Sequence, residues 1–174
     1  MRERPIIFSG PMVKAILEGR KTMTRRPLKP QPDESKVNIK NIPPGFLRCP
    51  YGIPGDRMWV RETWAPCDCG ATDCTGVIFK DHLGARKVTK WRPSIHLLRI
   101  HSRLTLEITN VRVEKLQEIV EQDAEKEGVF SVFEYGMPKH EAVNCFHSFW
   151  NSIYGQDAWD KNPWVWVIEF RVVK

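Results

Sequence analysis

Hydrophobic and polar positions alternate along several short stretches of the chain, a pattern typical of strands with one buried face. We predict strands at 5–8, 57–64, 77–79, 104–109 and 164–173. In the last of these strands, alternate residues place one apolar set on a common face, namely Trp164, Trp166, Ile168, Phe170 and Val172. The spacing of these strands gives no sign of an internal repeat.

Apolar residues spaced by three and four positions indicate three helices. The first begins after Ser9, with Pro11 in its first turn, and ends at Gly19. The second is predicted from about residue 114 to Gly128, and the third over 140–154, where Val143, Phe146, Trp150 and Ile153 are expected to be buried. Several strands with few helices between them favour an α+β fold, a mixed β-barrel flanked by short helices.

The 174 residues fit one domain, 1–174, with a Pro-rich arm at 28–55 and a Cys-rich insertion at 65–76. No apolar run approaches the roughly 20 residues that span a bilayer, and no export signal is recognisable. The chain has five cysteines, an odd number. Together with the lack of a recognisable export signal, this count predicts a cytoplasmic protein with free thiols. Zinc held by Cys67, Cys69 and Cys74, with Cys49 or His82, is the alternative.

Charge is unevenly distributed along the chain, whose net charge is +6. Residues 1–48 carry eleven Lys and Arg against four Asp and Glu, and residues 80–103 carry seven bases against one acid. Two basic tracts favour an anionic partner, and Trp91 within the second tract is suited to stacking on a nucleic-acid base. Solvated basic loops are the alternative interpretation of the same tracts.

Segment 18–26 combines four bases and two hydroxyls between the first helix and a predicted strand. If residues 21–25 are extended, Lys21 and Arg25 share one face, and Thr24 and Arg26 share the other. A lysine in a cleft beside cations and apolar walls has a lowered pKa and can accept a proton from a nearby hydroxyl. Because Lys21 and Thr24 fall on opposite faces, their pairing needs a twist or turn. A surface turn is the alternative.

Two carboxylates, Asp123 and Glu127, lie on the apolar stripe of the second predicted helix. Buried carboxylates are rare unless they are paired. Capping of a short helix explains Asp123, whereas Glu127 has no such explanation. We therefore predict that Glu127 pairs with Lys21 inside the fold.

The motif Gly19-x-Lys21-x-x-x-x-Arg26 matches the G-x-K-x-x-x-x-R signature of the ASCH superfamily, a PUA-like barrel associated with RNA. In the same order as in that family, Pro54-Gly55-Asp56 resembles its turn and Asp123-Ala124-x-x-Glu127-Gly128 resembles its helix end. The resemblance covers most of the chain except 28–50 and 65–100. It implies a PUA-like mixed β-barrel. The long arm and insertion are similar to those of longer bacteriophage and prophage proteins.

Around Lys21, the sequence also resembles the small bacterial ASCH amidohydrolases that remove acyl groups from N4-acetylcytidine. This resemblance implies that Thr24 is the nucleophile, Lys21 the proton acceptor and Glu127 the carboxylate that orients the lysine. Arg26, or backbone N–H groups of the Gly19 turn, would donate hydrogen bonds to the oxyanion. The expected substrate-binding residues are Gly19, Arg20, Arg26, Arg61, Trp64 and Trp91.

The first functional hypothesis is hydrolysis of an N4-acylated cytidine-type nucleoside or nucleotide. A non-catalytic RNA-binding module and a ribonuclease acting on single-stranded RNA are the two alternatives, because the same Lys and Arg residues serve all three. The expected partner is RNA or a cytidine-type nucleoside. No cofactor and no membrane are implied.

Overall fold

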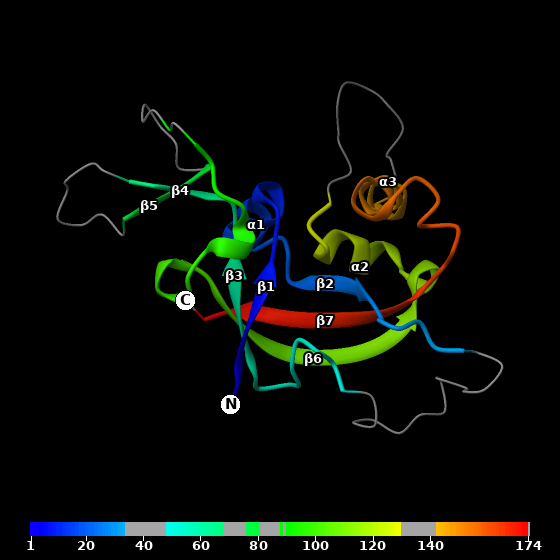
Figure 1. Ribbon diagram of the computed structural model, residues 1–174. Helices are drawn as coiled ribbons and strands as arrows, with labels where there is room; N and C mark the ends of the chain where they lie inside the picture. The colour runs from blue at the N-terminus through cyan, green and yellow to red at the C-terminus, as the bar shows by residue number, and fades with distance from the viewer. Residues whose placement is uncertain (34–47, 68–75, 81–87, 89, 130–141, 174) are drawn as a thin grey trace.

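The computed structural model describes residues 1–33, 48–67, 76–80, 88, 90–129 and 142–173 (Figure 1). Within these ranges the strands are β1 (Glu3–Ile7), β2 (Met23–Pro27), β3 (Arg57–Arg61), β4 (Trp64–Pro66), β5 (Val77–Phe79), β6 (Thr105–Lys115) and β7 (Trp164–Val172). The helices are α1 (Gly10–Leu17), α2 (Glu121–Lys126) and α3 (Ala142–Tyr154). Strands and helices are mixed along the chain, so the predicted α+β class is confirmed.

The main sheet is mixed, with the strand order β1-β3-β6-β7-β2. β1 and β3 are parallel, and the other neighbours are antiparallel. Within the described ranges no ladder joins the edge strands β1 and β2, so the sheet does not close into the predicted barrel. Instead, Arg26 on β2 donates from Nη2 to the carbonyl oxygen of Ile7 on β1 at 2.7 Å. A side chain therefore bridges the two edges.

The side chains of β7 alternate between two core clusters, because β7 lies inside the sheet between β6 and β2. Trp166, Ile168 and Phe170 pack in the cluster that contains residues of β1, α1 and β3. Val165 and Val167 pack in a second cluster with residues of α2 and α3. The sequence predicted only the first of these faces, and Val172 of that set is exposed at the strand end.

The second predicted helix is much shorter than expected. β6 continues through Lys115, because its ladder with β7 extends to the pair Lys115–Trp164. A 3-10 turn at Leu116–Glu118 follows, and α2 begins at Glu121. Gly128, with φ of +81°, follows the end of α2 as predicted. In α3, Phe146 and Trp150 are buried, whereas Ile153 is exposed, contrary to the prediction.

A smaller two-stranded sheet pairs β4 with β5 and lies apart from α2 and α3 (Figure 1). Its side chains form a third cluster that contains Trp64, Val77, Phe79 and Leu97.

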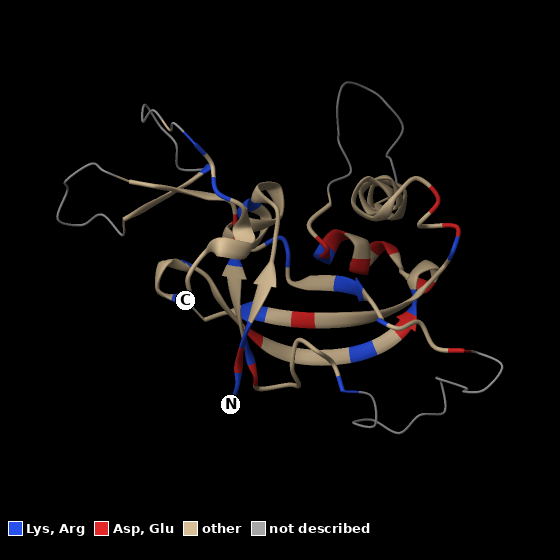
Figure 2. Cartoon of the chain, in the orientation of Figure 1, with Lys and Arg blue, Asp and Glu red and all other residues tan. Residues whose placement is uncertain are grey.

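In the part of the chain that the structure describes, no helix has the length and apolar character needed to cross a membrane. Acidic side chains gather on α2 (Figure 2).

Candidate functional site

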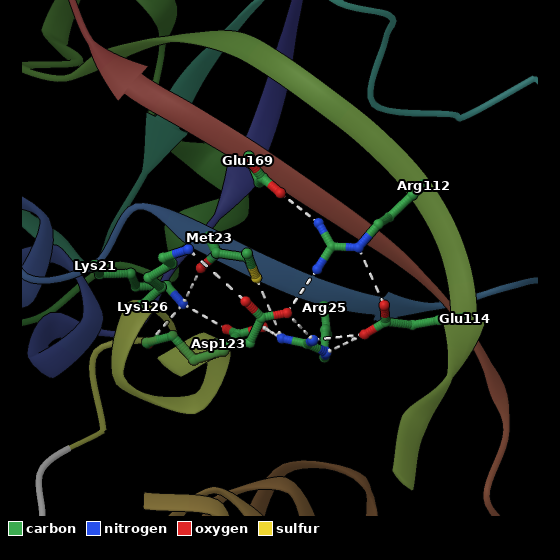
Figure 3. Close-up of polar contacts among 9 residues, drawn as sticks. Lys21, Met23, Arg25, Arg112, Glu114, Asp123, Lys126 and Glu169 are labelled. Atoms are coloured by element: carbon green, nitrogen blue, oxygen red, sulfur yellow. Dashed lines mark hydrogen bonds and ion pairs between the residues drawn. The ribbon is translucent and has the colours of Figure 1, made fainter. Parts of the chain in front are cut away.

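Lys21 lies in the turn between α1 and β2 and is buried, with only 1% of its surface exposed. The turn is held by the backbone N–H groups of Arg20 and Lys21, which both donate to the carbonyl oxygen of Ala15 at 2.9 and 3.0 Å. The Lys21 Nζ donates to the carbonyl oxygen of Met23 at 2.7 Å, and to the carbonyl oxygen and Oε2 of Glu127, both at 2.8 Å (Figure 3). All three ammonium protons therefore have acceptors.

Glu127 is 3% exposed and follows the last residue of α2. Its contact with Lys21 confirms the predicted pairing of these two residues, which lie 106 positions apart. Burial lowers the pKa of Lys21, and the neighbouring charges of Arg26 and Arg25 lower it further, whereas the charge and hydrogen bond of Glu127 act in the opposite direction. The neutral amine of Lys21 therefore forms at a lower pH than that of an exposed lysine.

A second buried cation, Arg25 on β2, extends the pair into a network of charges (Figure 3). Its Nη2 lies 2.5 Å from Oε1 of Glu114 and 2.9 Å from Oδ2 of Asp123, and its Nη1 lies 3.4 Å from Oε1 of Glu127. Arg112 on β6 contacts the same Asp123 and Glu114 at 2.6 and 3.1 Å. The network binds α2 to one face of the sheet and surrounds the Lys21–Glu127 pair with fixed charges.

Sequence reasoning did not find Arg25, Arg112 or Glu114 as members of this network. Helix periodicity was assigned from residue 114, although the ladder with β7 holds both Arg112 and Glu114 in β6. The signal that was present is the alternation of Val111 and Val113 with charged residues. The predicted capping role of Asp123 is wrong, because the N-cap of α2 is Val120 and makes no side-chain cap hydrogen bond. The Asp123 carboxylate instead accepts from both arginines.

Thr24 and Arg26 lie on the opposite face of β2 from Arg25. They pair with Ile168 and Trp166 of β7, whose side chains belong to the first core cluster. Thr24 is 1% exposed. Thr24 therefore lies on the face predicted for it, and the Lys21 ammonium donates to Met23 and Glu127 rather than to Thr24.

The Lys21 ammonium reaches toward both faces, because it lies before the start of the edge strand β2. Its Nζ is 5.6 Å from the ring centroid of Phe8, which belongs to the cluster beneath Thr24. Its other partner, Glu127, lies over the opposite face. The guanidinium of Arg26 also covers the Phe8 ring, at 5.3 Å. Lys21 and Arg26 therefore share Phe8 as a neighbour at the edge of the sheet.

Gly19 and Arg20 line a hollow of about 580 Å³ between the α1–β2 turn and α2. The other lining residues are Thr22, Gln122, Glu125, Lys126 and Val129. Beneath it, Gly128 is in close contact with Lys21, because a Cβ at position 128 would lie 2.9 Å from the Lys21 Cβ. The lining residues are sequence neighbours of Lys21 and Glu127, whereas these two buried side chains do not line the hollow themselves.

The remaining predicted binding residues, Arg61, Trp64 and Trp91, have their contacts elsewhere. Arg61 lies 4.5 Å from the Trp59 ring, Trp64 stacks on His101 at 6.3 Å, and Trp91 is covered by Lys80 at 5.5 Å. None of these contacts involves Lys21, Thr24 or Glu127. The structure therefore brings together Lys21, Glu127 and, through Phe8, Arg26, but not these three residues.

Several bases of the tract 80–103 contact the protein itself. Arg92 lies 5.0 Å from the Trp64 ring and Arg99 pairs with Glu3 at 2.9 Å. Arg103 pairs with the buried Glu62 at 2.6 Å. Arg92 and Arg103 therefore pack against side chains of β4 and β5, whereas Arg99 packs against β1. Cys69, Cys74 and His82, on which the zinc alternative depends, lie outside the described residues.

No family model matches the sequence, and no curated protein matches it. Solved structures do match. The chain is similar to a solved ASCH domain. That domain, from Lactobacillus crispatus JV V101, matches with a TM-score of 0.47 and 12% identity over 99% of this chain and 80% of its own.

Two further solved structures also match over 99% of this chain. Hypothetical protein PH0355 has a TM-score of 0.42 and 15% identity, and all of its own chain is covered. Protein EF3133 from Enterococcus faecalis V583 has a TM-score of 0.44 and 13% identity, with 80% of its chain covered.

Proposed function

We propose that this protein hydrolyses the acyl amide of an N4-acylated cytidine-type nucleoside or nucleotide, with Thr24 as nucleophile, Lys21 as proton acceptor and Glu127 as the positioning carboxylate. The observation that carries the proposal is the burial of Lys21 against Glu127, with its Nζ also bound to the carbonyl oxygen that precedes Thr24. A buried lysine with a lowered pKa and a specific charged partner is typical of a functional site.

In the proposed reaction, Oγ of Thr24 attacks the acyl carbonyl carbon and its proton passes to the neutral amine of Lys21. The C–N bond to the cytosine N4 then breaks, and Lys21 returns the proton to the departing nitrogen. Water hydrolyses the acyl-threonine ester by the reverse sequence of proton transfers and releases the carboxylic acid. Throughout, Glu127 accepts a hydrogen bond from Lys21 and keeps the amine oriented.

Arg26 supplies a donor for the oxyanion in this scheme. It lies two residues after Thr24 and therefore on the same face of β2. Its Nη2 is bound to Ile7, whereas its Nε is buried and has no hydrogen-bond partner among the described residues. An unpaired N–H beside the nucleophile is available to a developing negative charge. We expect Arg26→Met to lower kcat by about 100-fold or more.

The substrate class follows from the resemblance of residues 19–24 to the N4-acetylcytidine amidohydrolases. The hollow lined by Gly19, Arg20 and Thr22 has the volume of a small-molecule site, because about 580 Å³ lies within the usual range of roughly 300–1,000 Å³, but Lys21, Thr24 and Glu127 are not among its lining residues. Residues of both signs line this hollow, Arg20 and Lys126 against Glu125. A largely neutral nucleoside is compatible with that balance.

The test incubates the protein with N4-acetylcytidine and follows cytidine release by chromatography, in parallel with a labelled single-stranded RNA. We expect Thr24→Val and Lys21→Met each to lower the rate at least 100-fold. Thr109→Val is the matched control, because Thr109 is an exposed hydroxyl on β6 that does not line the hollow. It should keep the wild-type rate within about twofold, while circular dichroism verifies that each variant is folded.

Two results would count against the proposal. If the wild type releases no cytidine, the proposed reaction is wrong. If Thr24→Val and Thr109→Val turn over equally, the assignment of the nucleophile is wrong. Scission of the labelled RNA that is lost in Lys21→Met would instead identify the protein as a ribonuclease that uses the same lysine.

A further inference from the structure

A second hollow of about 510 Å³ lies on another part of the surface, between the end of α3, the start of β7 and the chain that follows β2. Its walls include the aromatic side chains of Trp150, Tyr154 and Trp164, and the prolines Pro27 and Pro163. The rings of Trp150 and Tyr154 lie 4.3 Å apart at 39°. The hollow has the size and the largely apolar lining typical of a pocket for a planar ligand.

Trp150, which lines this hollow, carries a hydrogen-bond donor without a partner among the described residues. The residue is 3% exposed, and its indole N–H is buried without an acceptor among the described residues. Buried N–H groups in proteins are nearly always paired, because an unpaired one has lost its bonds to water. An acceptor carried by a ligand, such as the carbonyl oxygen or ring nitrogen of a base, would complete it.

The rim of the hollow is positively charged. Lys29, Lys115 and Lys161 line it, and none of the described lining residues is Asp or Glu. Lys115 Nζ also lies 4.9 Å from the centroid of the Trp164 ring. Lysines beside aromatic walls suit a ligand with both a planar base and a phosphate. A purely apolar ligand would leave the lysines without an anionic partner, and free phosphate would not contact the aromatic walls.

The walls are fixed by hydrogen bonds within the protein. Gln31 donates to the carbonyl oxygens of Leu28 and Trp164 at 2.8 and 3.0 Å, and accepts from the Trp164 backbone N–H at 2.8 Å. Asn162 accepts from the backbone N–H of Gln117 at 2.9 Å. Gln31 joins the chain after β2 to the start of β7, and Asn162 joins the chain before β7 to the 3-10 turn after β6. The hollow is therefore preformed, which reduces the entropic cost of ordering it when a ligand binds.

We propose that this hollow binds a nucleotide, with the base against Trp150, Tyr154 and Trp164 and the phosphate near Lys29 and Lys161. The ligand is either a free mononucleotide or one nucleotide of a single-stranded RNA. The site is separate from Lys21 and requires no chemistry there. Its measurement needs binding alone, so it stands or fails independently of the proposed hydrolysis.

The test measures binding of cytidine monophosphate by calorimetry and of a fluorescein-labelled ten-nucleotide oligocytidylate by anisotropy. Trp150→Phe keeps a ring but removes the N–H, and should weaken binding about fivefold to tenfold, the effect of one net hydrogen bond. The double variant Lys29→Ala/Lys161→Ala should weaken oligonucleotide binding. It should also make the slope of log affinity against log salt concentration shallower by about 1.4, because each lysine that no longer neutralises a phosphate removes about 0.7.

Lys14→Ala is the matched control, because Lys14 is an exposed lysine on α1 whose side chain is 67% accessible. It should change neither affinity nor salt slope beyond error. Binding of the mononucleotide with the same variant pattern identifies a free-nucleotide site, and binding of the oligonucleotide alone identifies a strand-binding site. The proposal is overturned if neither probe binds below millimolar concentration, or if the Lys14 control weakens binding as much as the pocket variants.

Discussion

The Lys21–Glu127 pair should show strong energetic coupling in a double-mutant cycle of Lys21→Met and Glu127→Gln. Both side chains are almost fully buried, at 0% and 2% exposure. Glu127→Gln leaves the buried ammonium and the adjacent Arg25 without this counter-charge. Lys21→Met leaves a buried carboxylate whose contact with Arg25, at 3.4 Å, remains. The double variant removes both charges and keeps the approximate volumes.

The expected magnitudes follow from this arrangement. Removing one partner of a buried ion pair costs about 3–5 kcal/mol in the free energy of unfolding, because the other charge is left uncompensated. We place Glu127→Gln near the upper end of that range and Lys21→Met near the lower end, because Arg25 compensates only the carboxylate. For a chain of this size, each single variant should lower Tm by about 6–20 °C. The double variant should be more stable than Glu127→Gln alone.

Urea denaturation at pH 7, followed by circular dichroism, gives the four free energies of the cycle. The matched control is the exposed pair Lys14–Glu18, at 3.8 Å with 67% and 40% exposure. Its single variants should each change stability by no more than about 0.5 kcal/mol and should be additive. If the Lys21 and Glu127 variants are also additive, or change stability no more than the control, the pair does not carry the energetic role assigned to it.

Three further outcomes test other parts of the structure. Gly128→Ala should destabilise the fold by about 2–3 kcal/mol, because φ at this position is +81° and the new Cβ would lie 2.9 Å from the Lys21 Cβ. Gly19→Ala is the comparison, because φ is similar, at +72°, but the new Cβ would meet open space. A thermal melt should show a loss of only about 1 kcal/mol for Gly19→Ala. Backbone hydrogen bonds, chiefly the one donated by Arg2, lower the pKa of Asp56. The Asp56 carboxylate therefore stabilises the fold above its unfolded pKa of about 3.9, and this contribution is lost in acid. Asp56→Asn should accordingly lower the free energy of unfolding at pH 7 but not near pH 2. Because the pKa of Lys21 is lowered on folding, the unfolded chain binds its proton more tightly, and urea titrations should show the stability of the wild type relative to Lys21→Met rising with pH up to the unfolded pKa of about 10.4.

The pairing of Lys21 with Glu127 was predictable from the sequence because a carboxylate on an apolar helical stripe requires a buried partner. The network around it was not predictable in the same way. Arg112 and Glu114 belong to β6 only because β7, some 50 residues later, pairs with them. Local periodicity cannot show such a partner, and the helix assigned from residue 114 was therefore wrong.

The distribution of the predicted binding residues shows the same limit. Arg26 could be placed beside Thr24 by strand alternation alone, whereas Arg61, Trp64 and Trp91 depend on how β3, β4 and β5 are arranged. The nucleotide hollow joins segments near residues 29, 115, 150 and 164. No local pattern connects these segments.

By itself, the sequence determined the local features of this protein: the alternation that makes the strands, the glycines at 19 and 128 that end helices, and the motif around Lys21. Only the tertiary structure decided that the described strands leave the sheet open between β1 and β2, that charges fill one face of it beneath α2, and that Trp150 and three lysines line one hollow. The physical reason is range. Backbone propensity acts over a few residues, whereas burial and charge pairing depend on whichever distant segment packs nearby.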